Sequence, residues 1–136
     1  MMRATAASIL AVCMFAAVGG RSHAAEDLAP EQAMVRQLQQ AVRSDDRTWL
    51  ADHARYPVNY FGGGKRVIRN RAAFIRQYRS LISAKLRAAV LAQDPADVFK
   101  NSQGLMIGDG YYNIWVRDLG DGTTVNYQII TINNGP

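Results

Sequence analysis

From Gly104 to Asn134 the chain reads GLMIGDGYYNIWVRDLGDGTTVNYQIITINN. β-Branched and aromatic residues predominate in this stretch and glycines recur between them, which is typical of antiparallel strands joined by turns. Tyr112, Ile114 and Val116 occupy alternate positions, so their side chains point to one face of the predicted sheet. Residues 119–122 are expected to close a hairpin, because Asp-Gly tolerates the positive φ angles of tight turns.

A sheet with one apolar face needs a cover, and the preceding residues supply amphipathic helices for it. The expected elements are a helix over 30–43, a short helix over 47–54, a hairpin of strands 56–61 and 66–69, a helix over 71–82 with a continuation from 84, and strands from about 101. Asn70 and Ser83 are the expected N-caps. Pro57 indicates an edge strand. The predicted fold is α+β, with N-terminal helices packed on a curved antiparallel sheet.

Residues 1–24 have the pattern of a cleavable signal peptide. Arg3 precedes an apolar run from Ala4 to Val18, and Ser22-His23-Ala24 offers the small residues that a signal peptidase reads. The run is shorter than the roughly twenty residues of a membrane-spanning helix. We therefore expect export to the periplasm or the medium and no transmembrane anchor in the mature form, which is a domain over residues 25–136.

Cys13 is the only cysteine, and it lies inside the predicted signal peptide. A lipoprotein site at Cys13 is the alternative, but Val12 is bulky for the position before such a cysteine. The mature chain would then have no thiol, which excludes disulfides, thiolate catalysis and cysteine metal sites. About 110 residues remain, enough for one domain with one compact core.

Charge is distributed unevenly along this domain. Without Arg3 and Arg21, 14 of the 16 Lys and Arg residues remain against 11 Asp and Glu residues, a net charge of +3. From His53 to Gln93 there is no acid. The basic residues of this acid-free block are Arg55, Lys65, Arg66, Arg69, Arg71, Arg76, Arg79, Lys85 and Arg87. The block predicts one positive surface, although such runs also occur on ordinary solvated helix faces.

The order of elements resembles that of the NTF2-like superfamily, also described as the cystatin-like α+β cone. The resemblance covers nearly the whole mature chain, and the Tyr56-Pro57 strand start, Gly108-Asp109-Gly110 and the closing Ile129–Asn133 are similar to small exported domains of that type. It implies a curved sheet around a helix, with a conical pocket at the open end. Members include ketosteroid isomerases, dehydratases, transport adaptors and toxin-immunity proteins, so the fold does not select a function.

The catalytic candidates are few. His53 and Asp109 are the residues that could move a proton from an apolar pocket wall, with a tyrosine as the donor. Asp52 precedes His53, but neighbours on a helix point about 100° apart, so it cannot easily orient that ring. No set of metal ligands and no catalytic triad stands out, and no cofactor is predicted.

A binding site is indicated more strongly than a catalytic one. Ligand pockets are apolar and aromatic with a few polar groups, and arginine suits a carboxylate or phosphate. The candidate ligand-binding residues are Tyr56, Tyr60, Arg69, Tyr78, Trp115, Arg117 and Asn126. The same aromatic side chains could instead be ordinary packing.

These observations predict an exported, non-enzymatic binding module for a small anionic ligand or an acidic protein partner. The alternatives are a pocket enzyme of the ketosteroid isomerase or dehydratase type and a structural or immunity-type interaction domain. Nucleic acid is not the expected partner, because Phe74 and Tyr78, between the basic residues, belong to the predicted buried stripe. A homodimer through the sheet is a further possibility.

Overall fold

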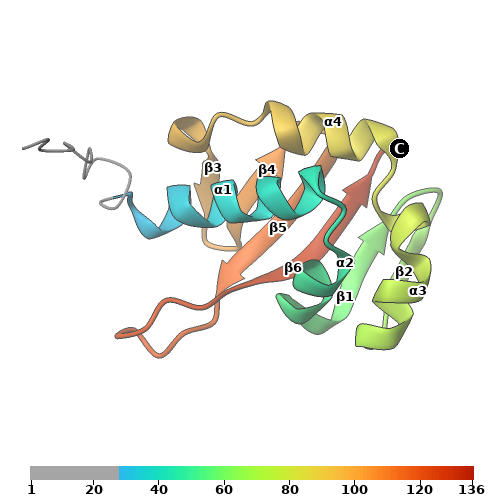
Figure 1. Ribbon diagram of the computed structural model, residues 1–136, viewed down its shortest axis with the longest axis horizontal. Helices are drawn as coiled ribbons and strands as arrows, with labels where there is room; N and C mark the ends of the chain where they lie inside the picture. Colours follow the sequence, from blue (N-terminus) through green and yellow to red (C-terminus); the bar gives the residue numbers. More distant parts are fainter. Residues whose placement is uncertain (1–27) are drawn as a thin grey trace, which may run out of the picture.

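The computed structural model describes residues 28–136. Within that range the fold is α+β, with four α-helices and one open six-stranded sheet, as the sequence predicts at this coarse level (Figure 1). The predicted signal peptide and Cys13 lie outside the described residues.

The helices are α1 (Pro30–Arg43), α2 (Arg47–Asp52), α3 (Arg71–Leu81) and α4 (Ala84–Ala92), followed by the short 3-10 turn η2 (Pro95–Asp97). The strands are β1 (Ala54–Phe61), β2 (Lys65–Ile68), β3 (Phe99–Asn101), β4 (Gly104–Gly108), β5 (Tyr112–Asp118) and β6 (Tyr127–Asn134). Asn70 caps α3 by accepting a hydrogen bond from the backbone N–H of Ala73 at 2.9 Å, and Ser83 caps α4 in the same way. Both predicted N-caps are therefore confirmed.

The sheet is mixed, so the prediction of a wholly antiparallel sheet is wrong. Its strand order is β2-β1-β6-β5-β4-β3, and β1 and β6 are parallel while the other neighbours are antiparallel. The last strand enters between β1 and β5, which joins the first hairpin to the C-terminal strands. The residue pattern of a strand does not encode the direction of a neighbour so distant in sequence.

β1 is an internal strand, and β2 is the edge of its hairpin. The pairing of β1 with β6 shifts register between Ala54 and Asn59. Pro57 lies within this interruption, where its missing N–H costs no ladder hydrogen bond, so the edge position expected for its strand is not needed. β1 also begins earlier than predicted, at Ala54, because the His53 carbonyl already accepts a hydrogen bond from the N–H of Ile129 at 2.7 Å.

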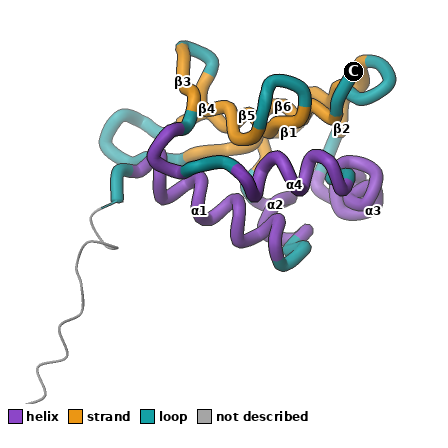
Figure 2. The backbone as a smooth tube through the Cα atoms, turned by 90° about the horizontal axis from the view of Figure 1, so that it is seen from above, coloured by secondary structure: helices purple, strands orange, loops and turns teal. Residues whose placement is uncertain are grey.

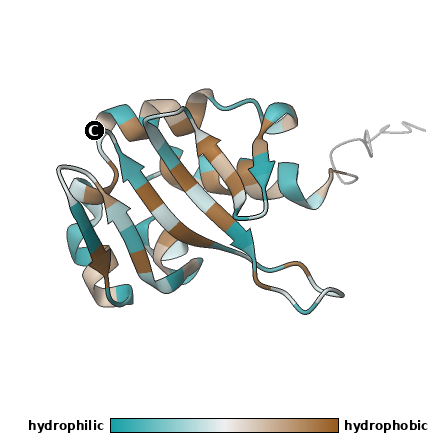
Figure 3. Ribbon diagram, turned by 180° about the vertical axis from the view of Figure 1, so that it is seen from behind, coloured by the Kyte–Doolittle hydropathy of each residue, from teal (hydrophilic) through white to brown (hydrophobic). Residues whose placement is uncertain are grey.

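All four helices cover one face of the sheet, and the other face carries no helix (Figures 2 and 3). A bulge in β6 helps to build the covered face: Trp115 pairs with Thr131 and Val116 with Ile129, so Ile130 is an extra residue. Ile129 and Ile132, three positions apart, are consequently both fully buried. The helices join this core through residues such as Leu38, Leu50, Phe74 and Leu86.

The loop between β5 and β6 is longer than the predicted four-residue turn and spans residues 119–126. Asp118 accepts hydrogen bonds from the N–H groups of Gly120 and Asn126, and Asp121 accepts from Thr123 and Thr124. The hydrogen bonds to Asp118 lower the pKa of its carboxyl group. The hydrogen bonds to Asp121, of which the one from the Thr123 hydroxyl has the largest effect, lower the pKa of Asp121 to about 2. Two successive turns, each stabilised by hydrogen bonds to an aspartate side chain, thus take the place of the predicted tight hairpin turn.

Candidate functional site

Seven cations of the acid-free block gather at one end of the molecule, where β1, β2 and α3 lie side by side (Figure 1). We call this surface the basic end; it consists of Arg55, Lys65, Arg66, Arg69, Arg71, Arg76 and Arg79. All seven residues are exposed. They come together because the hairpin and the helix that follows it are neighbours both in sequence and in space. This placement agrees with the predicted positive surface.

Most of these cations have no acidic partner among residues 28–136. The ion pairs among residues 28–136 are Asp52–Arg71 at 2.5 Å, Asp45–Arg87 at 4.0 Å and Glu31–Lys100 at 2.9 Å. Of the seven cations at the basic end, only Arg71 appears in these pairs, which leaves six without a carboxylate within 4.0 Å in the described part of the chain. The positive charge of this surface is therefore largely uncompensated.

The acids of the second half of the chain lie on other elements. They follow α4, form the β4–β5 turn, or belong to the end and loop of β5, away from α3 in Figure 1. These residues are Asp94, Asp97, Asp109, Asp118 and Asp121. These five carboxylates therefore lie away from the basic end, whereas Asp52, which pairs with Arg71, lies beside it.

Two of the cations contact aromatic rings, and not carboxylates. The guanidinium of Arg66 lies 4.5 Å from the centre of the Tyr60 ring and donates a hydrogen bond to Gln77 of α3 at 2.9 Å. The ammonium of Lys65 lies 5.8 Å from the centre of the Phe61 ring. A ring face attracts a cation without neutralising it, so these side chains are ordered and still able to meet an anion.

The structure does not bring the predicted ligand-binding residues into one site. Tyr60 and Tyr78 are buried in the core, and Trp115 lies on the helix-free face of the sheet. The remaining positions are also separate: Tyr56 is on β1, Arg69 follows β2, Arg117 ends β5, and Asn126 lies in the β5–β6 loop. The covered face is packed with fully buried residues, including Ile107, Ile114, Ile129 and Ile132.

The inward tyrosines are structural hydrogen-bond donors. Tyr56 donates to the Ala51 carbonyl at 2.7 Å, Tyr60 to the Ser80 carbonyl at 3.2 Å, and Tyr78 to Asp45 at 2.9 Å. Burial raises the pKa of Tyr56 to about 12 and also raises that of Tyr78, which the hydrogen bond to Asp45 raises further. These hydrogen bonds tie Tyr56 to α2, Tyr60 to α3 and Tyr78 to the turn between α1 and α2.

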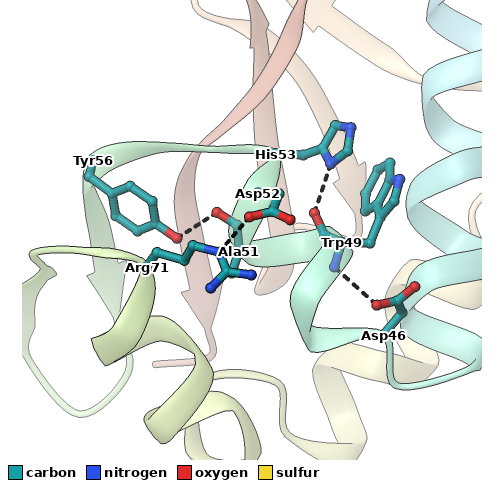
Figure 4. Close-up of polar contacts among 7 residues, drawn as sticks. All are labelled: Asp46, Trp49, Ala51, Asp52, His53, Tyr56 and Arg71. Carbon is teal, nitrogen blue, oxygen red and sulfur yellow. Dashed lines mark hydrogen bonds and ion pairs between the residues drawn. The ribbon is translucent and has the colours of Figure 1, made fainter.

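His53 lies at the end of α2 and is oriented by Trp49 (Figure 4). Its ring stacks on the Trp49 indole with a centroid distance of 3.9 Å, and its Nδ1 lies 2.7 Å from the Trp49 carbonyl oxygen. A carbonyl oxygen only accepts, so Nδ1 carries the hydrogen and the neutral ring has its lone pair on Nε2. Asp52 pairs with Arg71, and it does not orient His53.

A surface cavity of about 280 Å³ lies beside His53. It is lined by the start of α1, by His53 and by the β5–β6 loop, and the side chains in it include Met34, Gln37, Asn126 and Tyr127. Burial raises the pKa of Tyr127. The residues that line the cavity therefore include one imidazole and one phenol.

Asp109 is not part of this cavity. Its carboxylate accepts hydrogen bonds from the N–H groups of Tyr111 and Tyr112, both at 2.8 Å, and the residue is exposed. The side chain therefore shapes the β4–β5 turn, which is the common role of an aspartate between glycines.

The described residues contain neither a cluster of metal ligands nor a membrane-spanning helix. Between residues 28 and 136 no three His, Cys, Asp or Glu side chains gather closely enough to hold a metal ion. No helix in the same range is long and apolar enough to cross a bilayer.

Two features of the His53 region escape the sequence reasoning. The Trp49–His53 pair has the i, i+4 spacing that stacks side chains on one helix face, and this signal was available in the sequence. Tyr127 gives no such signal, because it reaches the cavity only through the fold of β6 and its loop.

Comparison with protein-family models, with curated proteins and with solved structures finds no match to this chain. Its function is therefore inferred from the placement of its own charged and aromatic side chains.

Proposed function

We propose that the protein is a non-enzymatic binding module whose basic end holds an acidic protein partner. The observation that carries this proposal is the set of six exposed cations on β1, β2 and α3 without a carboxylate partner among residues 28–136. Like charges left uncompensated on one surface repel each other, and an acidic partner relieves that repulsion. A protein partner fits better than a small anion, because these cations spread over two strands and a helix and do not converge on one cavity.

The proposal includes the NTF2-like cone as the fold type and export as the destination. The order of helices and strands supports the first, and the sequence of residues 1–24 supports the second. Neither is needed for the electrostatic part of the proposal.

Binding of poly-L-glutamate, followed by isothermal titration calorimetry, tests this function. We expect affinity to fall at least tenfold between 50 and 300 mM NaCl, since salt screens exposed charges. Reversal of two α3 charges, in Arg76→Glu/Arg79→Glu, is expected to weaken binding at least tenfold. Inorganic phosphate, as the probe for a small anion, is expected to bind at least a hundredfold more weakly than the polymer.

The matched control is Arg36→Glu/Arg43→Glu, which makes the same change of net charge at exposed positions of α1. It is expected to weaken binding less than threefold. Equal losses in the two double variants, or an affinity indifferent to NaCl, would remove the basic end as the binding site. Phosphate binding as tight as that of the polymer would replace the protein partner by a small ligand.

The second candidate function is proton abstraction next to a carbonyl group, with His53 as the base. The contact between Nδ1 and the Trp49 carbonyl favours it, because it leaves the Nε2 lone pair free beside a cavity that Tyr127 also lines. Asp109 has no part in this candidate, since its carboxylate is engaged in a turn.

Exchange of the α-protons of cyclohexanone in D₂O, followed by proton NMR, tests this candidate without knowledge of the natural substrate. If it is correct, the protein accelerates exchange at least tenfold over buffer, and His53→Gln abolishes the acceleration. Asp109→Asn serves as the control and is expected to keep it. A rate equal to that of buffer, or equal loss in both variants, would rule out His53 as the base.

A further inference from the structure

The helix-free face of the sheet carries a continuous row of side chains that crosses all six strands. The cross-strand register gives the row from β3 to β2 as Phe99, Met106, Trp115, Thr131, Asn59 and Val67. Phe99 is 53% exposed and Val67 is 40% exposed. The Phe99 and Trp115 rings meet edge to face at 6.2 Å, so one end of the row is a preformed aromatic surface. Large apolar groups left open in this way mark a contact surface more often than isolated ones do.

Cations of the strands border this row, and no strand residue that points to the same face is a carboxylate. Ala54, Ile68 and Val116 are buried on the covered face. Arg55, Lys65 and Arg117 lie an odd number of positions from them on the same strands, so alternation places these three cations on the helix-free face. None of the outward-pointing residues of the six strands is Asp or Glu. Arg55 and Lys65 also belong to the basic end, so the two surfaces are continuous at β1 and β2.

We propose that the acidic partner docks an amphipathic helix across this face, along the row from Phe99 to Val67. This inference rests on the proposed function and names the element that the basic end receives. Strands lie about 4.8 Å apart, so the row is about 24 Å long, the length of a helix of about sixteen residues. The apolar stripe of that helix covers Phe99, Met106 and Trp115 at one end and Val67 at the other, while its acidic residues meet the bordering cations.

Two other occupants of this face, a second copy of the protein and a membrane surface, fit it less well. A second copy placed face to face would bring Arg55, Lys65 and Arg117 against the same cations, which costs energy. A membrane surface is reached by apolar side chains that project from loops or helix faces, whereas Phe99 and Trp115 belong to strands and pack edge to face on each other. A helix with an apolar stripe and acidic flanks complements both the apolar side chains of the row and the cations that border it.

Three sixteen-residue peptides serve as probes: a helix of Leu and Glu with Leu at helical spacing, the same composition scrambled, and the first peptide with Lys in place of Glu. The protein has two tryptophans, so Trp49→Phe leaves Trp115 as the single indole reporter. We expect the acidic amphipathic peptide to bind at least tenfold more tightly than either other peptide and to shift the Trp115 emission to shorter wavelength. The indole N–H resonance of Trp115 gives the same readout in the unsubstituted protein, should Trp49→Phe fail to fold.

Val67→Ser on the row is compared with Val125→Ser in the β5–β6 loop, where the valine is 48% exposed. Val67→Ser is expected to lower the affinity for the acidic amphipathic peptide at least fivefold and to leave the affinity for poly-L-glutamate within twofold. Val125→Ser is expected to change neither affinity. Failure of poly-L-glutamate to bind refutes the proposed function itself. Poly-L-glutamate binding without preference for the amphipathic peptide refutes only the docked helix.

Two further outcomes would overturn the inference. One is a Trp115 emission shift with phosphatidylglycerol vesicles and none with the peptides, which would assign the face to a membrane. The other is a dimer in sedimentation velocity that Val67→Ser dissociates, which would assign it to a second copy.

Discussion

Phe74→Ala is expected to lower the free energy of unfolding by about 4 kcal/mol. Phe74 lies on α3, is fully buried, and belongs to the core shared by the helices and the sheet. Its truncation removes buried apolar surface and leaves a cavity that the packed neighbours cannot fill. A domain of this size is typically stable by about 5–15 kcal/mol, so the loss is a large part of the total. Urea denaturation followed by circular dichroism measures it.

Phe99→Ala is the matched control, because it makes the same chemical change at a phenylalanine that is 53% exposed. We expect a loss of about 1 kcal/mol, mostly from the edge-to-face contact with Trp115. Equal losses at the two positions would mean that α3 does not pack on the sheet as described.

Gly108→Ala is expected to cost about 3 kcal/mol. Gly108 has a φ of +130°, a backbone region that is almost confined to glycine, and an added Cβ would lie 2.2 Å from the Tyr112 carbonyl oxygen. That same carbonyl accepts a hydrogen bond from the N–H of Asp109 at 2.9 Å, so moving it away would also break the β4–β5 turn. Chemical denaturation again gives the value.

Gly110→Ala, two residues away in the same turn, provides the comparison. A Cβ there would meet nothing within 4 Å, and its φ lies outside the positive range. We expect the free energy of unfolding to change by no more than about 0.5 kcal/mol. If both alanines proved harmless, Gly108 would not be the conformational requirement of this turn.

Local features of the fold could be predicted from the sequence. Asn70 and Ser83 cap the expected helices, because a capping side chain needs only the N–H groups two or three residues ahead. Ile114 and Val116 point to the covered face as alternation requires. These interactions are contained within a few residues, so the local pattern determines them.

Features that depend on distant residues could not be predicted in this way. The parallel pairing of β1 with β6 joins segments about seventy residues apart, and the bulge at Ile130 appears only in the register between two strands. Neither leaves a periodic signal. The β5–β6 loop could be predicted in part. Asp121-Gly122 does make a turn, but the hydrogen bonds that the Asp118 side chain accepts make the loop longer than that turn.

The candidate sites differ for the same reason. The basic end follows from a run that is contiguous in sequence and folds into a hairpin and its neighbouring helix. Tyr60, Tyr78 and Trp115 are grouped as candidate ligand-binding residues only because all three are aromatic. The structure places the two tyrosines in the core and Trp115 on the helix-free face. Shared residue type does not place side chains on one surface when strand parity divides them.

The concentration of exposed cations at the basic end gives this protein an asymmetric electric field, which extends beyond its contacts. An approaching acidic molecule would be rotated toward the β2 edge before the surfaces touch, so encounters would begin in a productive orientation. The rate of association should then carry most of the dependence on ionic strength, while the lifetime of the complex should depend on the uncharged contacts that form last.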